Sequence, residues 1–127
     1  MKKRGGRKKI LVVDDDWAIL ELLKFTFSSS GFEVALSQSA EEFREKALSE
    51  KPDAIVLDIM LGTSDGTKVY HELLGAGLSR KVPVVFLSVL AQNISTTPPQ
   101  SGRTYALVAK PFDPEKLVRE VARVLEG

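Results

Sequence analysis

The sequence predicts an α/β fold in which helices cover both faces of an open, doubly wound, five-stranded parallel sheet. Short apolar runs without two-fold alternation are typical of strands that are buried on both faces. Four such runs occur, at residues 10–13, 54–57, 84–87 and 106–109, and a weaker run at 32–36 follows a glycine. Segments with helical spacing lie between the runs, so strands and helices alternate along the chain as they do in βαβ units.

The first half of the chain predicts two helices, one on each side of the weaker strand. Asp16 is a suitable N-cap for the first helix, and Gly31 is a suitable stop. Ser39 and Glu42, three residues apart, form the pattern of a capping box for the second helix. The positions expected to face the core are Ile19, Leu22, Leu23 and Phe27 in the first helix and Phe43, Ala47 and Leu48 in the second.

The second half predicts two further helices. One follows the run at 54–57 and stops near Gly75. The other follows the run at 106–109, with Asp113 as its N-cap and Pro114 as its first helical residue. The positions expected to face the core are Val69, Leu73 and Leu74, and then Leu117, Val121, Val124 and Leu125.

Length and composition favour a single domain. A chain of 127 residues, 43% of them apolar, can bury one sizeable core. The absence of cysteine excludes disulfides and thiolate chemistry, and no apolar run approaches the roughly 20 residues that span a bilayer. We therefore expect a soluble, cytoplasmic protein.

The N-terminus is strongly basic. The segment MKKRGGRKK opens the chain, and we expect residues 1–8 to be a disordered tail and residues 9–126 to be the domain. Such a tail could contact nucleic acid or an acidic partner, but a solvated leader is the simpler interpretation.

Polar side chains follow the strands, and the carboxyl ends of parallel strands meet at one edge of the sheet, where ligands bind. With the strand order 2-1-3-4-5, the residues brought together are Asp14, Asp15, Asp58, Ser88 and Lys110. A buried carboxylate without a partner costs several kcal/mol, so Asp58 needs one. Several carboxylates and one ammonium group favour a hard divalent cation, Mg²⁺ or Mn²⁺. A carboxylate flanked by a metal, a hydroxyl and an ammonium can act as a nucleophile toward phosphorus.

Four motifs, ILVVDDD, LDIML…DG, FLS and AKPF, resemble in order, identity and spacing the receiver domain of two-component response regulators. The resemblance runs from about Lys8 to Leu125 and implies a flavodoxin-like (CheY-like) fold. It implies that Asp58 is the phosphoacceptor, which takes a phosphoryl group from the phosphohistidine of a histidine kinase or from a phosphotransfer protein. The domain would then relay the signal by contact with a downstream protein.

The resemblance also implies roles for the neighbouring residues. Asp15 and the backbone carbonyl of Met60 would join the phosphoacceptor as direct Mg²⁺ ligands, and Asp14 would act largely through water. Ser88 would donate a hydrogen bond to a phosphoryl oxygen, and Lys110 would form an ion pair with the phosphoryl group.

The sequence departs from the family pattern at several positions. Gly62 stands where the family usually has proline, so we expect a more mobile loop there. Val89 replaces a small residue, and Leu107 replaces an aromatic one. Residues 91–103 contain adjacent prolines and β-branched residues, which are poor helix formers. We therefore expect the fourth helix of the family to be degenerate or missing.

Three alternatives are open to this chain. A degenerate receiver would bind a partner without phosphorylation. A metal-dependent phosphatase would use Asp14 or Asp16 as its nucleophile, although Ala18 stands where that family has Thr or Val. A flavin-binding protein of the same topology is disfavoured because three aspartates would repel phosphate. The leading hypothesis is a regulator that is neither a turnover enzyme nor a direct DNA binder, since no effector domain follows Gly127. We also expect no contact with a membrane.

Overall fold

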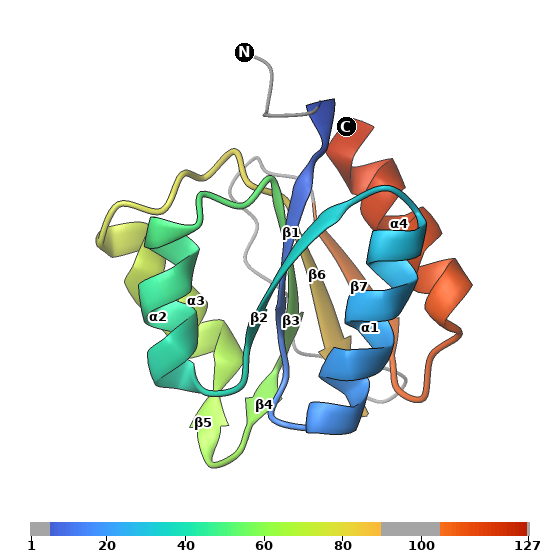
Figure 1. The fold of residues 1–127 in the computed structure, drawn as a ribbon. Coiled ribbons are helices and arrows are strands. Elements are labelled where there is room, and N and C mark those ends of the chain that lie inside the picture. The colour runs from blue at the N-terminus through green and yellow to red at the C-terminus, as the bar shows by residue number, and fades with distance from the viewer. Residues whose placement is uncertain (1–5, 90–104, 127) are drawn as a thin grey trace.

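A parallel sheet forms the centre of the fold in the computed structural model, which describes residues 6–89 and 105–126 (Figure 1). The strand order is β2-β1-β3-β6-β7. The strands are β1 (Lys9–Val13), β2 (Glu33–Ser37), β3 (Ala54–Asp58), β6 (Val84–Ser88) and β7 (Tyr105–Ala109). The two remaining strands, β4 (Met60–Leu61) and β5 (Ser64–Asp65), form a separate antiparallel hairpin. The five strands of the large sheet therefore have the predicted 2-1-3-4-5 order.

Helices cover both faces of the sheet, α2 and α3 on one side and α1 and α4 on the other (Figure 1). The helices are α1 (Trp17–Ser29), α2 (Ala40–Ser49), α3 (Gly66–Gly75) and α4 (Pro114–Glu126). Successive strand residues point to opposite faces, so each strand contributes to two cores. In β1, Leu11 and Val13 pack with Phe43 of α2, whereas Ile10 and Val12 pack in the cluster that contains Phe27 of α1.

The predicted helix caps are present. Asp16 and Asp113 accept hydrogen bonds from first-turn amides of α1 and α4, at 2.9 and 3.0 Å. The hydroxyl of Ser39 accepts one from the N–H of Glu42 at 3.2 Å, and the Glu42 carboxylate accepts in turn from the N–H of Gln38 at 2.7 Å. In a standard capping box the Glu side chain accepts from the N–H of the N-cap residue itself, whereas here it accepts from the residue before the N-cap.

The predicted core faces of two helices need correction. Leu22 of α1 and Leu48 of α2 are 44% and 40% exposed, and the buried face of α1 consists of Leu20, Leu23 and Phe27. Helix α1 carries apolar residues around much of its circumference, so more than one face satisfies the i, i+3, i+4 pattern. The prediction that α3 stops near Gly75 is confirmed, since Gly75 is its last residue; the left-handed residue that follows is Gly77, with φ of +117°.

The edge strand β2 has a specific contact on its open side. The carbonyl of Ser37 accepts from the N–H of Asp14 in the loop after β1, at 3.1 Å, so the carbonyl of the preceding residue, Leu36, points away from β1. The Nζ of Lys46 in α2 donates to that Leu36 carbonyl at 2.6 Å. A helix side chain thus satisfies one outward-facing acceptor of the edge strand.

Two predictions fall on parts of the chain that the structure does not describe. The segment 91–103, where we predict a degenerate or missing fourth helix, lies outside the described residues, as does most of the basic tail. Strand β1 begins at Lys9, and the division into a tail at 1–8 and a domain at 9–126 stays a prediction. Within the described residues, no helix combines the length and the apolar character that a membrane crossing requires.

Candidate functional site

The carboxyl ends of four neighbouring strands bring the five residues predicted for the site to the same edge of the sheet. Asp14 and Asp15 follow β1, Asp58 ends β3, Ser88 ends β6 and Lys110 follows β7. Oxygen atoms of the three aspartates all lie within 4.8 Å of one another. Asp14 and Asp58 are buried and Asp15 is exposed, so the cluster opens to solvent on the side of Asp15.

Lys110 links two of these carboxylates. Its Nζ lies 2.9 Å from Oδ2 of Asp14 and 3.0 Å from Oδ2 of Asp58. The other oxygen of Asp14 accepts from the N–H of Asp16 at 2.9 Å, and the Asp14 side chain is completely buried. Asp14 therefore has a hydrogen bond on each of its oxygens. The Lys110–Pro111 peptide bond, which follows the lysine, is cis.

The environment of the cluster shifts two pKa values in the absence of metal. Burial raises the pKa of the Asp58 carboxyl from 3.8 to about 6; the Asp14 charge adds to this rise, whereas Lys110 opposes it. Burial on its own would lower the pKa of Lys110, but its hydrogen bonds to Asp14 and Asp58 outweigh burial and raise that pKa above its ordinary value. The ammonium is thus firmly protonated, and one ammonium does not neutralise the three carboxylates.

The β4–β5 hairpin supplies two backbone donors to the cluster. The N–H of Met60 donates to Oδ1 of Asp58 at 3.1 Å, and the N–H of Gly62 donates to Oδ2 of Asp15 at 3.0 Å. Met60, which the resemblance places at the metal through its carbonyl, is therefore next to the cluster, and its side chain is 56% exposed. The sequence predicts neither donor, because any residue except proline has an N–H; the one signal is a glycine in a short segment after Asp58.

Ser88 ends β6, the strand next to the one that ends in Asp58. Its residue is buried, and its carbonyl accepts from the N–H of Lys110 at 3.0 Å, which ties β6 to the start of the loop that carries the lysine. The site thus combines oxygen ligands of the kind that Mg²⁺ prefers with one hydroxyl and one ammonium. The donor set fits a hard divalent cation.

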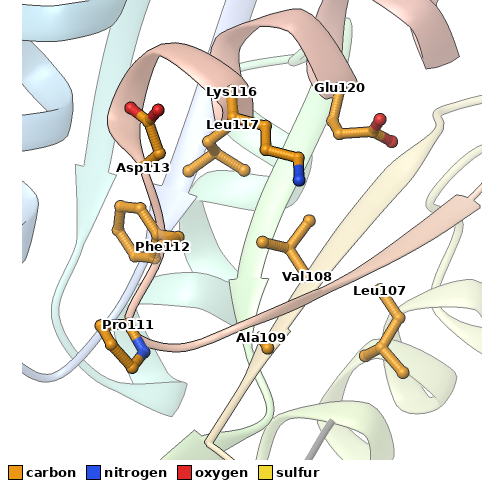
Figure 2. Close-up of a pocket in the computed structure, with 9 residues that line it drawn as sticks. All are labelled: Leu107, Val108, Ala109, Pro111, Phe112, Asp113, Lys116, Leu117 and Glu120. Atoms are coloured by element: carbon orange, nitrogen blue, oxygen red, sulfur yellow. The ribbon is translucent and has the colours of Figure 1, made fainter. Parts of the chain in front are cut away.

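A pocket of about 460 Å³ lies on the other side of the Lys110 loop, between β7 and α4 (Figure 2). Val108 points toward α4, Leu107 points to the opposite side of the strand, and Lys116 and Glu120 stand above the pocket on α4. None of the three clustered aspartates lines this pocket. It is separate from the candidate site.

The fold and the site define a class of protein: a doubly wound α/β domain with a cluster of three aspartates and a lysine at the carboxyl edge of its sheet. The family model for the response regulator receiver domain matches residues 10–122, and the chain belongs to this family. The chain is therefore a receiver domain, with a phosphoacceptor role in two-component signalling. Receiver domains are not classical enzymes, so the family assignment gives no support to the phosphatase and flavin-binding alternatives.

Two curated relatives illustrate the similarity. The chain is 35% identical over 118 residues to the alkaline phosphatase synthesis transcriptional regulatory protein PhoP of Bacillus subtilis (strain 168), covering 93% of this chain and 48% of that protein. It is 32% identical over 117 residues to the response regulator MprA of Mycobacterium tuberculosis (strain ATCC 25618 / H37Rv), covering 92% of this chain and 50% of that protein. The chain thus spans about half the length of the curated relatives it matches.

Solved structures agree on the fold. The chemotaxis protein CheY4 of Vibrio cholerae superposes with a TM-score of 0.77 at 25% identity, over 93% of this chain and 98% of that chain. The receiver domain of the Francisella response regulator 1452 gives a TM-score of 0.77 at 23% identity, over 94% of this chain and 98% of that chain. These likenesses confirm the predicted CheY-like topology.

Proposed function

We propose that Asp58 takes the phosphoryl group, from a sensor histidine kinase or a phosphotransfer protein, in a Mg²⁺-dependent reaction. The observation that supports this proposal is the position of Lys110, whose Nζ contacts both Asp58 and Asp14 within a cluster of three carboxylates. Asp14 is fully buried and bonded at both oxygens, which suits a positioning group. Asp58 ends the central strand β3, and its side chain is 6% exposed, whereas that of Asp14 is not exposed at all.

Each residue of the site has a separate role in the proposed phosphoryl transfer. Asp15, Asp58 and the carbonyl of Met60 would hold Mg²⁺, with Asp14 acting largely through water. When bound, the cation neutralises the carboxylates and withdraws charge from the phosphoryl oxygens. An oxygen of Asp58 forms the new P–O bond as the P–N bond of the phosphohistidine breaks, and the leaving nitrogen keeps the electron pair of that bond and takes a proton. Ser88 donates a hydrogen bond to one phosphoryl oxygen, and Lys110 pairs with another.

The consequence of phosphorylation is a change in protein contacts. We propose that the domain relays its signal to a downstream protein partner, without catalytic turnover of a substrate and without direct contact with DNA or a membrane. A cytoplasmic location, expected from the sequence, suits a domain that receives its phosphoryl group from a histidine kinase.

The test is the intact mass of the protein after treatment with acetyl phosphate and Mg²⁺. The unaltered protein should gain one phosphoryl group, and Asp58→Asn should gain none. Asp113→Asn is the matched control, because Asp113 is an exposed helix cap away from the cluster and asparagine also caps well. EDTA should abolish the gain.

Three outcomes would contradict the assignment. Equal labelling of Asp58→Asn, or labelling that persists in EDTA, would show that Asp58 is not the Mg²⁺-dependent acceptor. No labelling of the unaltered protein would favour the second candidate, a degenerate receiver that binds its partner without phosphorylation, which the departures at Val89 and Leu107 support.

A further inference from the structure

We infer that Gly62 is a positioning residue for the cation site, because its backbone N–H holds the carboxylate of Asp15 in place. This inference rests on the proposed function and concerns the cation that the proposal requires. Asp15 is the exposed member of the cluster, and its Oδ2 accepts from the Gly62 N–H at 3.0 Å, from a residue 47 positions later in the chain. An exposed carboxylate without such a contact would lose rotamer freedom when it binds an ion.

The turn that carries this N–H requires glycine. Leu61 pairs with Ser64 in the hairpin, which leaves a loop of two residues, Gly62 and Thr63. Gly62 has φ of +60° and Thr63 does not have a positive φ, the combination typical of a type II′ turn with glycine at its first central position. Proline would have φ near −65° and no N–H, so it could neither form this turn nor donate to Asp15. The departure from the family pattern therefore creates the contact.

The hairpin is fixed at both ends, so the donor is preorganised. Leu61 is buried in the core, and the Asp65 carboxylate caps α3 by accepting from the N–H of Thr67 at 2.9 Å. Gly66, the first residue of α3, donates to the carbonyl of Ile59 at 2.6 Å. These contacts favour an ordered hairpin over the mobile loop expected from the glycine alone.

The two hairpin amides act on two different carboxylates. Met60 donates to Asp58 and Gly62 donates to Asp15, so each carboxylate has one oxygen hydrogen-bonded to the hairpin before a cation arrives. Groups that orient metal ligands in this way contribute about 10- to 100-fold to metal affinity. Removal of the Gly62 donor should therefore weaken Mg²⁺ binding by at least about tenfold.

The first experiment titrates Mg²⁺ into the unphosphorylated protein and follows the fluorescence of Trp17. Gly62→Pro removes the donor and strains the turn, whereas Gly62→Ala strains the turn and keeps the donor. We expect at least about a tenfold loss of affinity in Gly62→Pro and a clearly smaller loss in Gly62→Ala. In an Asp15→Ala background, Gly62→Pro should have little further effect, because the group it positions is gone.

The second experiment needs no metal. Amide hydrogen exchange at Gly62 in EDTA should be slow in the unaltered protein and should become much faster in Asp15→Ala, since the acceptor is removed. Equal exchange in the two proteins, or equal Mg²⁺ affinity in the unaltered protein and Gly62→Pro, would overturn the inference. If the unaltered protein binds no Mg²⁺, the proposed function fails, and the exchange measurement alone decides whether Gly62 positions Asp15.

Discussion

Replacement of Asp58 by asparagine should stabilise the metal-free protein at neutral pH. In the absence of a cation, the Asp58 carboxylate is buried, lies beside the Asp14 charge and is only partly compensated by Lys110, and its pKa rises to about 6. Asparagine has nearly the same shape and no charge. Lys110 does not become unpaired in the variant, because its Nζ keeps the contact with Asp14 at 2.9 Å.

The size and the pH range follow from the pKa. The folded-state pKa of Asp58 lies about 2 above its ordinary value of 3.8, and a pKa difference of 1 corresponds to about 1.4 kcal/mol. The folded state therefore holds more protons than the unfolded state between about pH 4 and pH 6, so stability falls as the pH rises through this range. Asp58→Asn should be more stable by about 2 to 3 kcal/mol above pH 6, and this advantage should decline toward zero as the pH approaches 4.

Urea unfolding in EDTA, followed by circular dichroism at several pH values from 4 to 8, measures this difference. Asp113→Asn serves as the control and should show no comparable pH-dependent advantage. Added Mg²⁺ should reverse the order at neutral pH, because a ligand stabilises only the folded protein that binds it. A variant that is no more stable than the unaltered protein at pH 7, or whose advantage is the same at all pH values, would refute the reasoning.

Four further predictions concern the site and its surroundings. Asp15→Asn should weaken Mg²⁺ binding far more than Asp16→Asn in a fluorescence titration, since Asp16 caps α1 and asparagine also caps well; equal losses would contradict this ranking. Gly66→Ala should lower the free energy of unfolding in urea by about 1 to 3 kcal/mol, because a Cβ there would clash with the carbonyl oxygen of Asp58, and unchanged stability would argue against so close an approach. Met60→Glu should shorten the lifetime of the phosphorylated protein, followed by intact mass, because a carboxylate can orient an attacking water and the exposed Met60 thioether cannot; an unchanged half-life would exclude this role. Residues 91–103 should give no continuous run of helical backbone chemical shifts, and the presence of such a run would show that the fourth helix is regular.

The sheet could be predicted from the sequence because its strands are short apolar runs separated by helical segments, a pattern with few topological solutions. The buried faces of the helices could be predicted only in part. Apolar positions in α1 surround much of the helix, and packing against β-strands and α4 selects Leu20 over Leu22. The periodicity of the sequence does not determine which face of α1 is buried, because that depends on the surfaces against which the helix packs.

The candidate site could also be predicted only in part from the sequence. Asp14, Asp58 and Lys110 could be placed together because each lies at the end of a strand, and strand order then fixes their proximity. The Gly62 contact could not be placed, because it depends on a two-residue turn that orients a backbone amide toward a carboxylate 47 residues earlier. Backbone donors are common to nearly every residue, so their use is decided by conformation rather than by residue type.

The Lys46 contact on the edge of β2 has a consequence for self-association. An edge strand with open carbonyls and amides can pair with a strand of another molecule and start aggregation. The ammonium of Lys46 donates to the Leu36 carbonyl and places a positive charge on that edge, so an approaching strand would have to displace the ammonium or bury it. We therefore expect Lys46 to oppose edge-to-edge aggregation at high concentration.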